Sequence, residues 1–218
     1  MMKALRTLLL VVLVFPVVAS AQVSLGLRVG YGIPGGDLAK DDPLKDNLSS
    51  QIPLQLDVLY RVKPQVAVGG YLGYGFAQVS STLKDAIGAP PDASYSASTF
   101  RLGLQGTYSF PQESFVPWLG LGSGLETANF EVKSGGIKVT GTTRGWEYLN
   151  LQGGADLKVS KTFGLGLYAS FAVGAFHYQG MEISGAGPGI DGSAGGGLGS
   201  DSATHNWFTI GLRGLFDL

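Results

Sequence analysis

The 218-residue chain has no cysteine, and charged residues make up only 14% of it. Without cysteine it can form no disulfide, thiolate metal site, lipid-anchored cysteine or cysteine nucleophile. Its 44% hydrophobic content is too high for an intrinsically disordered chain. With a formal net charge of −1 it has no excess of basic residues, so we expect no binding to nucleic acid.

Glycine and aromatic residues, in contrast, are abundant. The chain has 35 glycines, 9 tyrosines and 11 phenylalanines. So much glycine is unfavourable for a helical fold, because glycine lowers helix propensity by about 1 kcal/mol per residue relative to alanine. The composition therefore favours a β-rich protein of one domain.

The first 21 residues have the organisation of a secretory signal peptide. Lys3 and Arg6 form a basic start, an apolar run follows over residues 8–18, and the small residues 19–21 match an A-x-A cleavage pattern. The alternative is a membrane-spanning helix, but the apolar run falls short of the ~20 residues that a span needs. No later segment approaches that length, so we expect no spanning helix in the mature chain.

We predict cleavage between Ala21 and Gln22, which makes residues 1–21 a signal peptide and residues 22–218 one mature domain. Removal of Lys3 and Arg6 takes the formal charge from −1 to −3.

Eight segments of the mature chain alternate apolar and polar residues with a period of two, which is typical of strands with one apolar face. They lie at residues 23–33, 51–62, 65–76, 99–108, 118–126, 148–159, 163–173 and 208–218. Their connections alternate between short turns (63–64, 111–114, 160–162) and long polar segments near 35–50, 80–97, 131–145 and 179–204. This arrangement predicts eight antiparallel up-and-down strands, with both mature termini on the short-turn side.

The distribution of charge between the two faces favours a transmembrane barrel over a soluble, lipocalin-like one. The apolar faces carry no charge, as lipid requires, because Arg or Lys at the bilayer midplane costs about 2–4 kcal/mol. The polar faces mix long charged side chains with glycine, which suits the narrow lumen of eight strands. The sequence therefore predicts an all-β, eight-stranded antiparallel transmembrane β-barrel.

Outward aromatic residues fall near the strand ends and predict two girdles at the membrane interfaces. One set lies near the short turns: Tyr60, Tyr108, Phe110, Phe115, Phe163 and Phe216. The other lies near the long loops: Tyr31, Tyr74, Phe76, Phe100 and Phe208.

The chain resembles the small eight-stranded outer-membrane proteins, namely the OmpA transmembrane domain, OmpX and OmpW-like barrels. The resemblance rests on the signal peptide, the eight amphipathic strands, and stretches such as 115–122 (FVPWLGLG) and 164–168 (GLGLY). It implies a monomer in the outer membrane of a Gram-negative cell envelope, with periplasmic termini and extracellular loops. It further implies contact with outer-membrane lipids and lipopolysaccharide, and insertion by the barrel-assembly machinery. Such proteins commonly end on an aromatic residue, whereas this chain ends on Leu218 with Phe216 two residues earlier.

The charges on the polar faces have two interpretations, a paired network that plugs the barrel or the lining of a water-filled pore. Eight strands favour the plug. An unpaired buried charge costs several kcal/mol, so we expect arginines and carboxylates of the interior to contact one another. The predicted interior network consists of Arg28, Asp57, Arg61, Arg101, Glu126, Asp156, Arg213 and Asp217.

Two glycine motifs could indicate ligand sites but lack the required context. Residues 30–35 match G-x-G-x-x-G, yet a polar loop follows where a dinucleotide site needs a helix. Residues 196–201 match one G-G-x-G-x-D calcium unit, and such units act in stacks of three or more. We therefore expect no cofactor and no bound calcium.

His177 and His205 bracket the fourth long segment, so we expect two solvated histidines near each other at the outer rim. A metal site would need a further ligand from that loop. A hydrolase would need a serine beside a histidine, and Ser170 and Ser202 are the nearest candidates in sequence. We see no catalytic motif, and expect neither a metal site nor an enzyme.

The sequence thus predicts a non-enzymatic integral outer-membrane protein with a structural or surface-interaction role through four extracellular loops. The second hypothesis is a narrow channel for small solutes. The third is an outer-membrane lipid-modifying enzyme.

Overall fold

A computed structural model of the chain describes residues 23–88, 93–110, 112–185 and 191–218. The predicted signal peptide, 1–21, and its cleavage site lie outside the described residues. Within the described part, no helix is long and apolar enough to cross a membrane.

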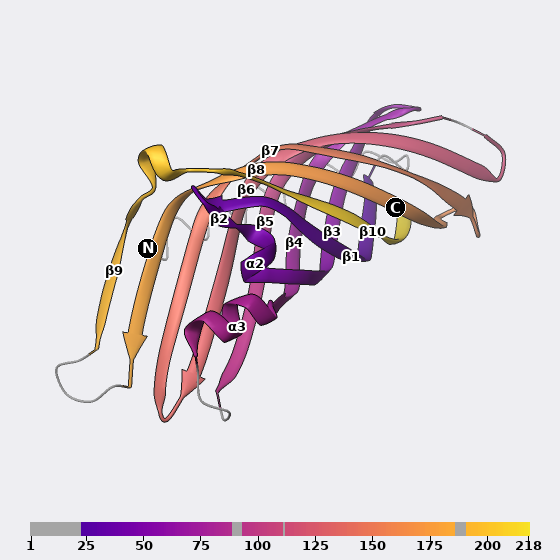
Figure 1. Ribbon diagram of the computed structural model, residues 1–218. Helices are drawn as coiled ribbons and strands as arrows, with labels where there is room; N and C mark the ends of the chain where they lie inside the picture. Colours follow the sequence, from indigo (N-terminus) through magenta and orange to yellow (C-terminus); the bar gives the residue numbers. More distant parts are fainter. Residues whose placement is uncertain (1–22, 89–92, 111, 186–190) are drawn as a thin grey trace, which may run out of the picture.

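Eight long strands form a closed antiparallel barrel (Figure 1). They are β1 (Val23–Ala39), β3 (Leu48–Lys63), β4 (Val66–Val79), β5 (Ser94–Ser109), β6 (Phe115–Ser134), β7 (Ile137–Lys158), β8 (Phe163–Ser184) and β10 (Thr204–Asp217). Each pairs with the next along the chain, and β10 pairs with both β8 and β1 to close the ring. The predicted eight-stranded up-and-down barrel is confirmed.

The two ends of the barrel differ, and we name them by their connections. The turn end carries the three short turns and the C-terminus, while the loop end carries the long connections (Figure 1). Small elements lie in those connections: β2 (Asp42–Pro43), α2 (Leu44–Asn47), α3 (Ser81–Ile87), β9 (Gly192–Gly197) and a 3₁₀ turn (Gly199–Asp201).

Two of the long segments expected as polar loops are strand extensions instead. β6 and β7 continue to a hairpin in which Ser134 pairs with Ile137. The turn residues Gly135 and Gly136 have φ angles of 57° and 84°, which glycine adopts at no steric cost in a tight two-residue turn. The expected loop over 179–204 contains the end of β8 and the strand β9 that pairs with it. Backbone pairing therefore orders these segments despite their polar composition.

The apolar residues of the alternating segments point away from the barrel axis. Leu27, Leu104, Leu121, Leu167 and Ile210 are between 56% and 75% exposed, although they lie in the middle of strands. The outward aromatic residues of both predicted girdles, such as Tyr31 and Phe216, are about half exposed as well. A continuous apolar belt of this kind is the surface that a hydrocarbon environment requires.

β7 departs from strict alternation, which corrects one face assignment. Strict alternation over residues 148–159 puts Tyr148 on the lumen face, but it is 52% exposed on the outer surface, next to outward-facing Leu149. A β-bulge between Glu147 and Leu149 puts two residues against one on β8 and so reverses the phase of the alternation. Glu147 consequently points inward and is fully buried.

The belt predicts a depth-dependent cost for an outward charge. Leu121 lies in the apolar belt of β6, six residues beyond Phe115, and Leu157 pairs with Phe115 at the turn-end girdle. Leu121→Arg should lower the free energy of unfolding by about 2–4 kcal/mol, and Leu157→Arg by about 0–1 kcal/mol. Denaturant unfolding of the barrel in phospholipid vesicles measures both. Equal costs at the two positions would contradict a membrane-spanning belt.

Candidate functional site in the barrel interior

The middle of the lumen is occupied by an ion pair between β1 and β3. Arg28 Nε donates to Asp57 Oδ2 at 2.6 Å, and the two side chains are 1% and 0% exposed. Arg28 Nη1 also donates to Gln152 Oε1 at 2.5 Å, which links β1 to β7 on the far side of the barrel. Gln55 and Gln105 each donate to Asp57 Oδ1 at 2.8 Å, so both carboxylate oxygens are satisfied.

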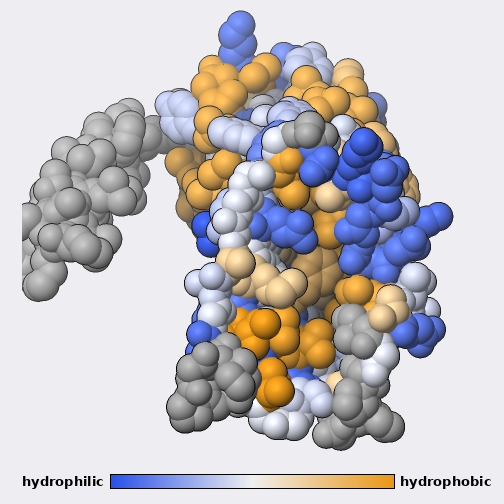
Figure 2. Space-filling view, turned by 60° about the vertical axis from the view of Figure 1, so that its left-hand side comes forward, coloured by the Kyte–Doolittle hydropathy of each residue, from blue (hydrophilic) through white to orange (hydrophobic). Residues whose placement is uncertain are grey.

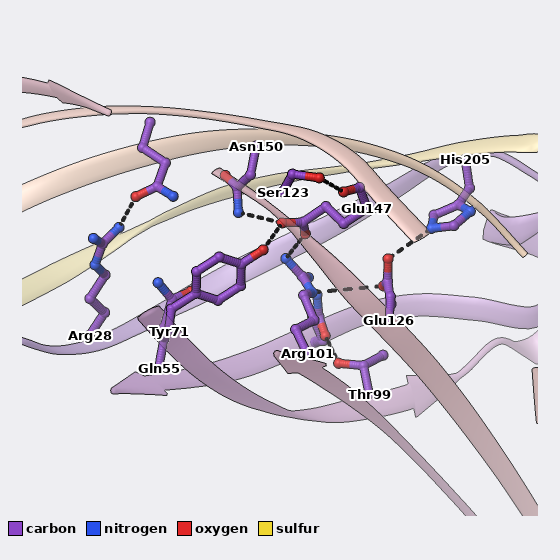
Figure 3. A network of polar contacts seen from close by, with 12 residues as sticks. Arg28, Gln55, Tyr71, Thr99, Arg101, Ser123, Glu126, Glu147, Asn150 and His205 are labelled. Atoms are coloured by element: carbon purple, nitrogen blue, oxygen red, sulfur yellow. Dashed lines mark hydrogen bonds and ion pairs between the residues drawn. The ribbon is translucent and has the colours of Figure 1, made fainter. Parts of the chain in front are cut away.

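A second cluster centres on Glu147 and lies nearer the loop end (Figure 3). Glu147 accepts hydrogen bonds from Tyr71 Oη at 2.6 Å, Asn150 Nδ2 at 2.9 Å and Arg101 Nη1 at 3.2 Å. Glu126 lies on the other side of Arg101, with 3.7 Å between Oε1 and the arginine Nε. These side chains come from four adjacent strands, β4 to β7.

His205 extends this cluster toward the loop end. Its Nε2 lies 2.9 Å from Glu126 Oε2, and its ring stacks on Phe176 with centroids 4.1 Å apart. The imidazole is only 1% exposed. The polar network therefore ends on an aromatic stack.

A third pair lies toward the turn end. Arg213 Nη1 donates to Asp156 Oδ2 at 3.2 Å, and the guanidinium lies 4.1 Å from the centre of the Trp118 ring. At the turn end itself Arg61 Nη2 donates to Asp217 Oδ1 at 3.0 Å, where both side chains are about a third exposed. Burial thus decreases from the middle of the barrel toward this opening.

Inward-facing glycines make room for these large side chains. A Cβ atom at Gly154 would lie 2.9 Å from Cζ2 of Trp118, and one at Gly30 would lie 2.8 Å from Oη of Tyr168. A Cβ at Gly103 would collide with the Tyr71 hydroxyl. Because these glycines have no side chain, they leave space on the polar faces that the interior aromatic residues fill, as dense packing of a narrow lumen requires.

An apolar cluster closes the loop end. It contains Leu38, Leu44, Leu48, Ala128, Ala172, Phe176 and Trp207, each at most 4% exposed. Leu44 belongs to α2, so the first connection folds inward instead of extending into solvent. Figure 2, which brings the loop end forward, shows hydrophobic side chains gathered in the centre of this face and hydrophilic ones along one flank.

Backbone contacts hold the loop-end connections to one another. Lys40 N–H donates to Asp201 O at 2.9 Å, and Ser80 N–H donates to Asn47 O at 3.0 Å. The Ser80 hydroxyl also donates to Asp46 O and caps α3 by accepting from Leu83 N–H at 3.1 Å. The first connection, with α2, is thereby tied to the second and the fourth.

The eight charged residues expected in the interior fall into three groups in the structure. Arg28 meets Asp57; Arg101 meets Glu126; Arg213 meets Asp156, with Arg61 and Asp217 paired at the opening beyond it. The sequence reasoning did not include Glu147 and His205 in this network. Both were detectable, since Glu147 could not face lipid, and continuing the alternation back from Thr209 points Trp207 and His205 inward.

The expectation that the two histidines lie together at the outer rim is wrong. His205 is buried in the lumen, whereas His177 lies exposed on the outside of β8. Alternation explains the separation, because His205 continues the inward phase of β10 while a register shift near His177 turns it outward.

Ser202 lies beside His177, not beside its sequence neighbour His205. Its Oγ is 3.2 Å from His177 Nδ1 and donates to Phe176 O at 2.9 Å, while Tyr148 Oη lies 2.7 Å from His177 Nε2. A neutral imidazole satisfies this chain by donating from Nδ1 to Ser202 and accepting from Tyr148 at Nε2. In this arrangement the histidine has no lone pair facing the serine, and the three side chains form a hydrogen-bonded clasp.

The two glycine motifs lie in strand and turn structure. Residues 30–35 are part of β1, with no helix following at that point, and residues 196–201 run from β9 into the 3₁₀ turn. In the described part of the chain, no three His, Asp or Glu residues are placed to hold a metal ion.

The hairpin of β6 and β7 carries a separate charged group. Glu131 accepts from Lys133 Nζ and Lys138 Nζ, each at 2.6 Å. These two hydrogen bonds hold the pKa of the Glu131 carboxyl below its usual range. The hairpin therefore keeps this ion pair at neutral pH.

The buried position of Asp57 gives a stability prediction for the network. Asp57→Asn leaves Arg28 without its counter-charge in a site closed to water, which should cost about 3–5 kcal/mol of unfolding free energy. The matched control is Arg61→Gln, which breaks the partly exposed pair with Asp217 and should cost at most about 1 kcal/mol. Both are measured by denaturant unfolding in lipid vesicles, and similar small costs would contradict a dry, paired lumen.

Comparison with known proteins agrees with this architecture. Residues 7–171 match the family model described as outer membrane protein beta-barrel domain. No curated protein sequence matches the chain significantly.

Solved structures show similar folds at low sequence identity. A major outer membrane protein from Thermus thermophilus has a TM-score of 0.55 and 14% identity, over 89% of this chain and 99% of that chain. Neisserial surface protein A has a TM-score of 0.47 and 15% identity, over 91% and 98% of the two chains. OprG from Pseudomonas aeruginosa has a TM-score of 0.47 and 14% identity, over 90% and 97%. On the match to the family model, the chain belongs to the outer membrane β-barrel domain family, whose place is the bacterial outer membrane.

Proposed function

We propose that this protein is a sealed, non-enzymatic outer-membrane barrel that acts structurally and through surface interactions of its loop end. The observation that carries the proposal is the filled lumen. Buried ion pairs, aromatic rings and the apolar cluster follow one another from Arg213 to Leu44, and each of these residues is at most 8% exposed.

A filled lumen argues against the second hypothesis, a narrow solute channel. An ion moving along the axis would have to separate Arg28 from Asp57 and Arg101 from Glu147, both buried pairs. Breaking a buried pair without replacing the lost partner costs about 3–5 kcal/mol for each pair. The loop end adds the apolar cluster, which offers a passing ion no polar ligand.

The clasp of His177, Ser202 and Tyr148 argues against the third hypothesis, a lipid-modifying enzyme. In the hydrogen-bond arrangement that satisfies all three groups, the Ser202 hydroxyl donates to the Phe176 carbonyl oxygen and accepts from the histidine. No carboxylate completes the constellation among the described contacts of His177. Surface interaction is thus the simpler role for this region.

The loop end supplies the surface for that role. The β6–β7 hairpin and β9 extend past the apolar belt (Figure 1). The hairpin carries the exposed side chains of Lys133 and Lys138, and the recorded partner of β9 is β8 on one side. In the proposed orientation this end is extracellular and the termini are periplasmic. Exposed cations beside the belt suit contact with the phosphates of lipopolysaccharide, and the belt itself suits a monomer surrounded by outer-membrane lipid. Insertion through the barrel-assembly machinery belongs to the same proposal.

A barrel with a sealed lumen should conduct no ions. The purified, refolded full chain reconstituted in planar lipid bilayers should show no steady, discrete conductance steps, because buried side chains occupy the axis. A large porin in the same bilayers serves as the positive control. Reproducible unitary openings that scale with the amount of this protein would overturn the sealed-barrel proposal in favour of the channel.

The absence of cysteine allows a direct test of orientation. Ser193→Cys on exposed β9 and Ser160→Cys in the β7–β8 turn introduce single thiols at opposite ends of the barrel. A membrane-impermeant maleimide should label the first on intact cells and the second only after the outer membrane is opened. Labelling in the reverse order would place the loops in the periplasm and remove the surface role.

A further inference from the structure

The turn end of the barrel contains a vestibule with a volume of about 470 Å³. Residues from all eight strands of the ring or from the short turns beside them contribute to its lining, and it ends at Arg213 and Asp156 inside the barrel. This volume lies within the range of small-molecule sites, about 300–1,000 Å³. The cavity is separate from the filled lumen and the loop-end surface on which the proposed function rests.

Positive charge predominates in the vestibule. Its lining includes four cationic side chains, Arg61, Lys158, Lys161 and Arg213, and two carboxylates, Asp156 and Asp217. Asp156 Oδ2 accepts from Arg213 and Asp217 Oδ1 accepts from Arg61, so each carboxylate is paired with a cation, although Asp156 Oδ1 has no hydrogen-bond partner among the described residues. The two lysines therefore leave an uncompensated positive potential at the opening.

Arg213 at the inner end has unused hydrogen-bonding capacity. A guanidinium has five N–H donors. Among the described residues the recorded acceptor of Arg213 is Asp156 Oδ2, and its Nε, although buried, has no partner. Trp118 covers one face of the guanidinium at 4.1 Å and holds it in place. A fixed, partly unsatisfied guanidinium at the end of a cavity is a suitable receptor for an oxyanion.

We propose that the vestibule binds a small solute that carries a phosphate or carboxylate group. The anionic group lies toward Arg213, and Lys158 and Lys161 attract it at the opening. Lys158 Nζ donates to Gln112 O at 3.1 Å and keeps two further donors for a ligand. In the orientation proposed above the solute enters from the periplasm, but binding itself depends only on the vestibule and not on orientation or on a sealed lumen.

The proposal is tested on the full chain, refolded in a non-ionic detergent, by calorimetric titration with inorganic phosphate and with pyrophosphate at about 0.1 M ionic strength. Saturable binding is expected for both, tighter for pyrophosphate because it carries more charge. The double variant Lys158→Gln/Lys161→Gln should weaken binding about tenfold, as expected for the loss of charge-assisted contacts. Both lysines are exposed, so this variant should fold.

A matched double variant removes the same charge at the other end. Lys40→Gln/Lys84→Gln changes two exposed lysines of the loop-end connections and should leave the affinity within about twofold, because at 0.1 M salt a Debye length of about 10 Å screens charges at the opposite end of the barrel. Arg213→Gln should abolish binding, with heat-modifiable gel migration as the check of folding. If this variant fails to fold, the lysine pair still decides the question.

Three results would overturn the proposal. They are the absence of saturable heat with either anion, an equal loss of affinity in both lysine double variants, and binding of phosphatidylglycerol in mixed micelles without binding of the free anions. The last result would assign the cations of the turn end to lipid headgroups instead of a solute.

Discussion

The structure depends on the closure of β10 against β1. Hydrocarbon offers no hydrogen-bond partners, so every backbone N–H and C=O in the membrane must be satisfied within the protein. The continuous pairing from Ser24–Asp217 to Gly36–His205 meets this requirement and leaves no open edge at the seam. Closure also separates a lumen from an outer surface. The two-residue period of each strand then directs polar side chains into the lumen and apolar side chains to the outer surface.

Once eight strands enclose the lumen, the interior must be filled and its charges must be paired. Glycines at positions such as Gly30 and Gly154 leave space for Tyr168 and Trp118, so large rings and guanidinium groups share a narrow core. Arg28 and Arg101 each contact carboxylates and also lie near aromatic faces, which lowers the cost of keeping charge away from water. The same residues therefore fill the lumen and pair its charges.

The two ends of the barrel are built for different surroundings. At the loop end α2 turns Leu44 inward and backbone bonds tie neighbouring connections together, so the apolar mouth is closed and the hairpins project beyond it. At the turn end the charge network stops short of the opening and leaves a cationic vestibule. Under the two proposals above, the loop end and the vestibule bind different partners on the two sides of one membrane.

The sequence by itself determined the strand number, the antiparallel order and the two faces, because alternation and charge exclusion from lipid are properties of local sequence. It also identified the interior charges, since Arg28 or Asp57 cannot face hydrocarbon. Only the tertiary structure decided which interior side chains meet: Arg28 contacts Gln152, 124 residues away, because ring closure and strand tilt bring them together. The bulge at Glu147 and the separation of His177 from His205 likewise depended on register between strands, which a single strand's pattern does not encode.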